Sequence, residues 1–216
     1  MTTRRMVVWR HGQTAWNARG MAQGQTDVPL DEMGLEQARN AAARLASLRP
    51  VYIRTSDLSR AVDTANELAA LTGLDPSTDP RLREMHMGAR QGLSLSRAFE
   101  LFPEQMQAWR EGRDVALPGA ESYGEVAERM AGALTEAADA LQAGQTGVLV
   151  SHGAAMRVGI CRYLGLPQQH WSAFGGFSNC SWALLEEGRL GWRVAEWNAG
   201  SLPEPVLSDD LVNSDD

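Results

Sequence analysis

Two histidine–glycine pairs in this chain each follow a short apolar run. Residues 6–9 lead through an arginine into His11-Gly12, and residues 147–150 lead through a serine into His152-Gly153. Short β-rich runs that end near glycine are typical of buried strands. Ligands in open α/β sheets lie beyond the carboxyl ends of parallel strands. If these strands are neighbours, both imidazoles face one pocket, where a ring can act as nucleophile, base or metal ligand. For either histidine alone, the alternative is a ring that caps a strand and is satisfied locally.

Arg60 stands in the first turn of a predicted helix, where a cation opposes the helix macrodipole. A residue placed against local preference is a candidate for function. Its guanidinium could hold two oxygens of one phosphate near the end of the second strand. A surface arginine paired with Asp57 or Asp63 is the weaker alternative.

Glu84 lies in a connection that also contains arginine and histidine. A carboxylate near two histidines could first donate and then accept a proton. The alternative is a solvated acid paired with Arg81 or Arg83. His86, two residues later, either supports the site from outside or is a buried histidine with satisfied nitrogens.

The chain contains no lysine, because all twenty basic residues are arginine. This excludes Schiff-base and Walker-lysine chemistry. His11 and His152 have no histidine partner at helical spacing, and neither a His-Glu-x-x-His nor a Cys-x-x-Cys motif occurs. We therefore expect no metal and no cofactor, with arginine and histidine neutralising a phosphoryl group.

The net charge of −7 is concentrated at the C-terminal end, where five acids and no base lie from residue 199 onward, so the rest carries only −2. We interpret 199–216 as a solvated, disordered acidic tail and 1–198 as one domain. No basic run suggests nucleic acid, and no stretch resembles a membrane span or a secretory signal. Cys161 and Cys180, interpreted as core residues, fit a reducing cytoplasm, and a homodimer is compatible with the sequence.

Hydrophobic periodicity predicts an α/β fold, a three-layer sandwich whose mostly parallel central sheet lies between helices. Strands are expected at 6–9, 51–53 and 147–150, and a polar loop is expected at 13–31. Helices are expected at about 34–48, from a cap at Ser56 or Asp57 to about 71, from 122 to about 141, and at about 153–164. A C-terminal hairpin of 181–185 and 190–197, joined through Glu187-Gly188, closes the chain.

Residues 94–120 break this alternation of strands and helices. Their apolar residues keep helical spacing, but Pro103 interrupts them, so we expect two short helices with the second beginning at Pro103. This segment is a candidate lid over the pocket. Trp109 within it and Trp171 could border a substrate, the alternative being that both fill the core.

The combined pattern resembles the histidine phosphatase superfamily, which includes cofactor-dependent phosphoglycerate mutase. The motifs follow the family's order from about residue 5 to 160. They are Arg10-His11-Gly12-Gln13-Thr14 with Trp16-Asn17, Gln23-Gly24, Asp27-Val28-Pro29-Leu30, Ser56-Asp57-Leu58-Ser59-Arg60-Ala61 with Thr64-Ala65, Leu82-Arg83-Glu84, Pro118-Gly119-Ala120-Glu121-Ser122 and Ser151-His152-Gly153.

The resemblance implies a two-step phosphoryl transfer. His11 would attack phosphorus and form phosphohistidine, with a backbone carbonyl fixing its tautomer. Glu84 would protonate the leaving oxygen and then assist water. The phosphate-binding residues would be Arg10, Arg60, His152 and Asn17, together with Gln23 and Gly24 of the following loop.

Whether the acceptor is water or a second hydroxyl is the main functional question. Residues 84–92 resemble mutases in His86 and in their Gly-Ala-x-Gln-Gly sequence. Ser94-Leu95 stand where mutases carry Asn-Lys, however, and Ala154 stands where they tend to have asparagine. These departures favour a metal-independent phosphatase that hydrolyses phosphomonoesters, with phosphoglycerate mutase as the alternative.

Within the phosphatases, the sequence is similar to a subgroup that acts on glucosyl-3-phosphoglycerate. The similarity rests on residues 19–25, 82–84 and 174–182. We therefore expect a phosphorylated sugar or glycerate as the small-molecule substrate. That subgroup often has tryptophan at the position of Arg90, so the identity of the substrate stays open. The roles of His86, Arg90 and Arg157 are open as well.

Overall fold

The computed structural model describes residues 3–200, which form a six-stranded sheet between helices. The strand order is β3-β2-β4-β1-β5-β6, and β1 to β4 pair in parallel while β5 and β6 add antiparallel strands. The strands are β1 (Arg5–Arg10), β2 (Tyr52–Thr55), β3 (Ser77–Thr78), β4 (Thr146–Ser151), β5 (Trp182–Gly188) and β6 (Gly191–Ala199). The predicted α/β class and mostly parallel sheet are confirmed.

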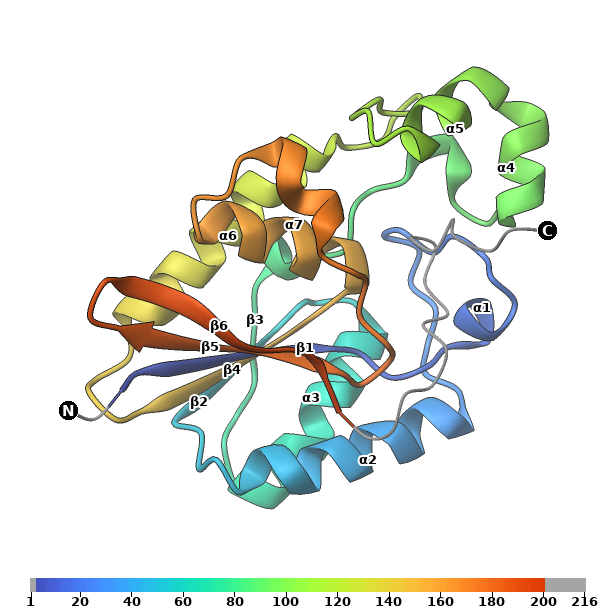
Figure 1. Ribbon diagram of the computed structural model, residues 1–216. Coiled ribbons are helices and arrows are strands. Elements are labelled where there is room, and N and C mark those ends of the chain that lie inside the picture. Colours follow the sequence, from blue (N-terminus) through green and yellow to red (C-terminus); the bar gives the residue numbers. More distant parts are fainter. Residues whose placement is uncertain (1–2, 201–216) are drawn as a thin grey trace.

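Two pairs of helices cover the two faces of the sheet (Figure 1). Helices α2 (Glu32–Ala46) and α3 (Ser59–Thr72) pack on one face, and α6 (Tyr123–Asp139) and α7 (Gly153–Tyr163) pack on the other. Alternate residues of β1 point to opposite faces, so Val7 belongs to the core under α2 and α3, and Val8 to the core under α6 and α7. Both strand faces are therefore buried, which explains the continuous apolar run of β1.

Capping explains where several helices begin. At α6, the Ser122 hydroxyl accepts from the Glu125 nitrogen while the Glu125 carboxylate accepts from the Ser122 nitrogen, which is the predicted capping box. The expected cap of α3 at Ser56 or Asp57 is wrong: the N-cap is Leu58, which makes no side-chain bond. The reason is that Asp57 binds Arg83 and the Ser56 hydroxyl lies against His152.

The candidate lid, residues 94–120 and called the lid below, contains two short helices, as expected, α4 (Leu95–Leu101) and α5 (Pro103–Arg110). They stand apart from the layered body in Figure 1 and have a small apolar core of their own. The buried residues of that core are Ala98, Met106 and Leu117. The lid therefore packs largely on itself, beside the sheet edge where β1 and β4 end.

Several short elements differ from the expectations. The polar segment 13–31 contains a four-residue helix, α1 (Ala15–Ala18), and short 3₁₀ helices occupy Pro80–Leu82, Gly88–Arg90 and Gln168–Ala173. The hairpin turns at Arg189-Leu190 rather than at Glu187-Gly188, because Gly188 still pairs with Gly191. Cys161 and Cys180 are buried, as expected.

Of the predicted tail, Ala199 ends β6 and Gly200 follows it, and positions 201–216 lie outside the described residues. Within residues 3–200, none of the helices is long and apolar enough to cross a membrane.

Candidate active site

The two histidine–glycine pairs meet at one edge of the sheet. Strands β1 and β4 are neighbours in parallel register, with Arg10 opposite Ser151. The next residue of each strand is a histidine, and the His11 and His152 ring centroids lie 5.0 Å apart with their planes inclined by 59°. The predicted juxtaposition of the two imidazoles is present.

His11 is held in one orientation. Its Nδ1 lies 2.6 Å from the carbonyl oxygen of Gly12, so Nδ1 carries the proton and donates it, and Nε2 keeps its lone pair. Burial, and then the charges of Arg60 and Arg10, hold the pKa of His11 well below its usual value of 6.5. The ring is therefore neutral at physiological pH, as a nitrogen nucleophile must be.

Gly12 permits this geometry by its lack of a side chain. Its backbone passes so close to Gly34 that an added Cβ would overlap the Gly34 carbonyl group. The same turn is secured by a bond from the Gly12 nitrogen to the Thr64 hydroxyl (3.1 Å). The turn that carries the nucleophile candidate is thus packed directly against α2 and α3.

His152 is completely buried and is bonded through both ring nitrogens. Nδ1 accepts from Nε of Arg60 at 3.3 Å, so Nε2 carries the proton and donates to the Ser56 hydroxyl at 2.9 Å. Burial, followed by Arg60 and His11, lowers its pKa well below 6.5. His152 is therefore bonded to Arg60, the arginine that we expect to bind phosphate.

Arg60 is fully buried, which contradicts the alternative of a surface ion pair. Its terminal nitrogens donate to the carbonyls of Thr26 (2.9 Å) and Gly24 (2.7 Å). With Nε bonded to His152, these bonds leave one N–H on each terminal nitrogen, a fork suited to two phosphate oxygens. Burial lowers the pKa of Arg60 to about 10, so the guanidinium stays charged at neutral pH.

The loop after His11 adds neutral donors. Asn17 and Gln23 are buried, and their side-chain oxygens lie 3.1 and 3.0 Å from the Thr14 hydroxyl. Because the oxygens turn toward Thr14, the amide NH₂ groups are directed the other way. Gly24 supplies the carbonyl that holds Arg60, and its φ of +52° suits glycine.

Arg10 supplies the second guanidinium. It is 4 % exposed, and its Nη1 donates to the carbonyl of Phe177. Gly153 lies against the guanidinium, because a Cβ there would sit 3.5 Å from Nε. The first turn of α7 and the end of β1 therefore hold Arg10 between them.

Glu84 is buried and bound to the N-terminus of α7. Its carboxylate accepts from the backbone nitrogens of Met85 (2.8 Å), Ala154 (3.2 Å) and Ala155 (2.9 Å). The alternative of a solvated acid is wrong because Arg81 pairs with Asp79 and Glu136, and Arg83 pairs with Asp57. The helix end holds this carboxylate at the cavity that His11 also lines, and its dipole stabilises a negative charge there.

These side chains enclose one small cavity of about 30 Å³. Seven of the eight predicted site residues line it, and His152 stands behind them against Arg60 and His11. The seven are Arg10, His11, Asn17, Gln23, Gly24, Arg60 and Glu84. A cationic cup with a neutral imidazole and a carboxylate can hold a phosphoryl group and transfer it.

Three residues of the site were not singled out from the sequence. Ser56 was expected to cap a helix but orients His152, and Met87 lines the cavity. Asn179 donates to the carbonyl of His11 (3.1 Å) and to Oδ1 of Asn17 (3.3 Å). The Phe-Gly-Gly-Phe-Ser-Asn segment was the available signal for Asn179, but nothing in it indicates contact with residues 162 and 168 positions earlier.

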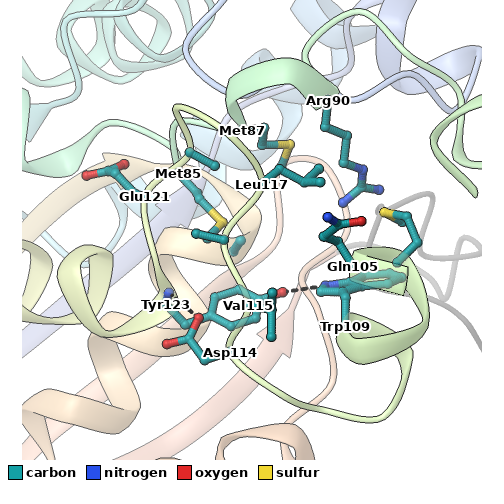
Figure 2. A pocket seen from close by; sticks show the side chains of 14 residues that line it. Met85, Met87, Arg90, Gln105, Trp109, Asp114, Val115, Leu117, Glu121 and Tyr123 are labelled. Carbon is teal, nitrogen blue, oxygen red and sulfur yellow. Dashed lines mark hydrogen bonds between the residues drawn. The ribbon is translucent and has the colours of Figure 1, made fainter. Parts of the chain in front are cut away.

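The residues left open by the sequence lie outside the phosphate cavity. The His86 ring is partly exposed and its Nδ1 lies 2.8 Å from the Gly119 carbonyl, so it supports the base of the lid. Arg90 and Trp109 line a neighbouring cavity below the lid (Figure 2), and Arg157 and Trp171 line a third. Among the described residues, no three His, Cys, Asp or Glu side chains form a candidate metal site.

The family of this chain follows from sequence comparison as well as from the site. The model of the histidine phosphatase superfamily (branch 1) matches residues 6–200. The match spans the sheet, the lid and both histidines. The chain therefore belongs to the histidine phosphatase superfamily.

Named relatives narrow the class further. The chain is 38 % identical over 218 residues to a glucosyl-3-phosphoglycerate phosphatase of Mycolicibacterium vanbaalenii, covering 93 % of this chain and 97 % of that protein. A solved mycobacterial glucosyl-3-phosphoglycerate phosphatase in complex with VO₃ has a TM-score of 0.85 and 40 % identity, over 91 % of this chain and all of that one. A probable phosphoglycerate mutase of Cronobacter sakazakii is also 38 % identical, over 87 % of each chain. With its family and its phosphatase relatives, the chain is a phosphoric monoester hydrolase.

Proposed function

We propose that this enzyme hydrolyses phosphomonoesters through a phosphohistidine on Nε2 of His11. The observation that carries the proposal is the 2.6 Å contact between His11 Nδ1 and the Gly12 carbonyl. It leaves the Nε2 lone pair available in a buried ring that is neutral. The cavity in front of the ring is lined by two guanidinium groups, which compensate the charge of a phosphate.

In the first step, His11 Nε2 attacks phosphorus and the bond from phosphorus to the ester oxygen breaks. Arg60 would hold two of the three phosphoryl oxygens through its remaining N–H groups, with Arg10 and the amide of Asn17 holding the third. The leaving oxygen takes a proton from Glu84. A phosphate dianion beside this carboxylate favours its protonation when the substrate binds, because like charges repel.

In the second step, water attacks the phosphohistidine and the bond between phosphorus and Nε2 breaks. Glu84, now ionised, accepts a proton from the water, so that it returns to its acid form. His152 would stabilise the transferring group by holding Arg60 in place. Both steps use the same cavity, so the same arginine side chains compensate the charge of the phosphoryl group in each.

We infer that the substrate is a phosphorylated sugar or glycerate such as glucosyl-3-phosphoglycerate. The names of the similar phosphatases support this inference. So does a cavity of about 250 Å³ beyond Trp109 and Tyr123, whose arginine and glutamine side chains can donate to sugar hydroxyls. We also infer a cytoplasmic enzyme, because a chain with only two cysteines, both buried, has too few for a disulfide framework. A homodimer is testable by light scattering.

The experiment is a test for the covalent intermediate. Incubation with p-nitrophenyl phosphate in EDTA, followed by rapid alkaline quenching, should yield phosphate on His11 that is labile to acid and stable to base. His11→Ala should give neither phosphoenzyme nor p-nitrophenol. Phosphate found on another side chain, or turnover abolished by EDTA, would refute the mechanism.

Phosphoglycerate mutase is the second candidate, favoured by the relatives that carry that name at the same identity. Incubation with 3-phosphoglycerate and a bisphosphoglycerate primer separates the two. We expect phosphate release to exceed formation of 2-phosphoglycerate. Isomerisation that outpaces phosphate release would reverse the assignment.

A further inference from the structure

The cavity below the lid lies next to the phosphate cavity. Met87 and Ala154 line both of them, so a group attached to the phosphate can extend from one into the other. The lid cavity is about 50 Å³, large enough for a small substituent, whereas the cavity beyond it is about 250 Å³. The residues that line the lid cavity therefore determine which chemical groups can follow the ester oxygen in the leaving group.

Most of this lining is apolar. Figure 2 shows Met85, Met87, Val115 and Leu117 around the space, with the Trp109 indole closing one side. Nε1 of Trp109 donates to the Tyr123 hydroxyl at 2.7 Å, which holds the lid against the start of α6. An apolar enclosure of this kind excludes water and strengthens any charge interaction made inside it.

Arg90 places a cation in that enclosure. Its side chain is 7 % exposed, and its guanidinium carbon lies 5.1 Å from the centre of the Trp109 ring. Gln105 lines the same cavity, and its amide points toward the Arg90 side chain in Figure 2, so it can add a donor there. A planar guanidinium supported on an aromatic face is well suited to bind a carboxylate.

The two acids that line the same cavity are engaged in the structure around it. Glu121 accepts from Arg129 (2.8 Å) and from the His86 nitrogen (2.7 Å). Asp114 accepts from the Tyr123 nitrogen (2.8 Å) and from the Gln168 amide (2.8 Å). The charge of Glu121 is thus compensated by Arg129, and the oxygens of Asp114 are occupied by neutral donors. Arg90 is the cation that lines this cavity.

We propose that Arg90, with Gln105 and Trp109, forms a subsite for a carboxylate carried by the leaving group. The enzyme would then prefer phosphomonoesters of short hydroxy acids, in which two carbons separate the ester oxygen from the carboxylate carbon. The proposal rests on the proposed function, because it describes the leaving group of that reaction. It applies equally to free 3-phosphoglycerate and to its glycosylated forms.

The test compares three substrates that share the phosphate and differ beyond it: 3-phosphoglycerate, glycerol 1-phosphate and p-nitrophenyl phosphate. We expect kcat/KM of the unaltered enzyme to favour 3-phosphoglycerate over glycerol 1-phosphate by about ten- to a hundredfold, the worth of a charged hydrogen bond. Arg90→Met keeps an unbranched side chain against Trp109 and removes the charge. This variant should lose the preference for 3-phosphoglycerate, and its kcat/KM for p-nitrophenyl phosphate should stay within about twofold of that of the unaltered enzyme.

Two further variants separate recognition from packing. Arg97→Met removes an exposed lid cation that pairs with Glu100, and it should leave all three rates unchanged. Arg90→Lys should recover part of the preference, because it restores the charge without the planar fork. Glycerate should inhibit p-nitrophenyl phosphate hydrolysis more strongly than glycerol does, and Arg90→Met should remove that difference.

The outcomes are distinct for the two proposals. Equal loss on all three substrates, or an unchanged preference in Arg90→Met, would show that Arg90 only packs the lid. Equal rates on the two alkyl phosphates in the unaltered enzyme would also overturn the subsite, while leaving the phosphatase intact. If the enzyme released phosphate from none of the three substrates, the proposed function itself would be overturned.

Discussion

Glu84 and Ala155 are bonded across 71 positions of sequence, with Oε1 of Glu84 2.9 Å from the Ala155 nitrogen. Helix α7, which receives this bond, has His152 as its N-cap residue. One helix end therefore positions the carboxylate, the second histidine and, through Gly153, the guanidinium of Arg10. A shift of α7 would disturb all three groups together.

Replacing the nucleophile candidate should abolish turnover. We expect His11→Ala to lower kcat by about 10³-fold or more, because the nucleophile and the base-stable intermediate are both removed. Phosphate release from p-nitrophenyl phosphate measures the effect. His86→Ala is the matched control, since its ring lies at the base of the lid, and activity in that variant should be largely retained. Comparable losses in both variants would contradict the assignment.

Arg60→Ala should reduce kcat/KM by at least about 10²- to 10³-fold, the usual cost of one positioned donor to the transition state. Arg60→Lys should restore little of it, because an ammonium cannot reproduce bonds to Gly24, Thr26 and His152 while also holding phosphate. Arg39→Ala, which removes a surface arginine paired with Glu67, is the control. An Arg60→Lys variant with nearly full activity would argue against the forked contact.

Glu84→Gln should slow alkyl phosphates more than aryl phosphates. An alkoxide needs a proton as it leaves, whereas a nitrophenolate is a stable leaving group and needs little help. The measurement is the ratio of kcat/KM for glycerol 1-phosphate to that for p-nitrophenyl phosphate in both enzymes. A ratio unchanged by the substitution would be inconsistent with proton donation.

The ligand-free enzyme should lose stability as the pH falls below about 6.5. The folded-state pKa values of His11 and His152 are depressed by burial, so the unfolded chain binds protons that the folded chain does not. Each histidine then lowers the free energy of unfolding by up to about 1.4 kcal/mol for every pH unit between its unfolded and folded pKa values. Urea unfolding at pH 7.5, 6.5 and 5.5 measures the slope.

A comparison variant isolates the histidine contribution to that slope. His152→Asn removes one of the two titrating rings, so its loss of stability between pH 6.5 and 5.5 should be the smaller one. His170→Asn changes an exposed ring and should leave the slope as it is. Identical slopes in all three proteins would mean that other groups control the acid transition.

The local elements were predictable because their signals are local. The Ser122–Glu125 capping box and Pro103 marked helix starts that the structure contains, and the apolar run before His11 is strand β1. The start of α3 was not predictable in this way. Ser56 and Asp57 have the side chains of helix caps, but bonds to His152 and Arg83 engage them instead.

By itself, the sequence determined the kinds of chemistry available: histidine, arginine and carboxylate without lysine or a metal motif, placed after strands that a parallel sheet would align. Only the tertiary structure decided which nitrogen of His11 is free, that Arg60 is buried with its fork open, and that Glu84 is bound to α7 rather than to its neighbouring arginines. The physical reason is that tautomer, burial and pairing depend on contacts between residues distant in the chain, and no local propensity encodes those contacts.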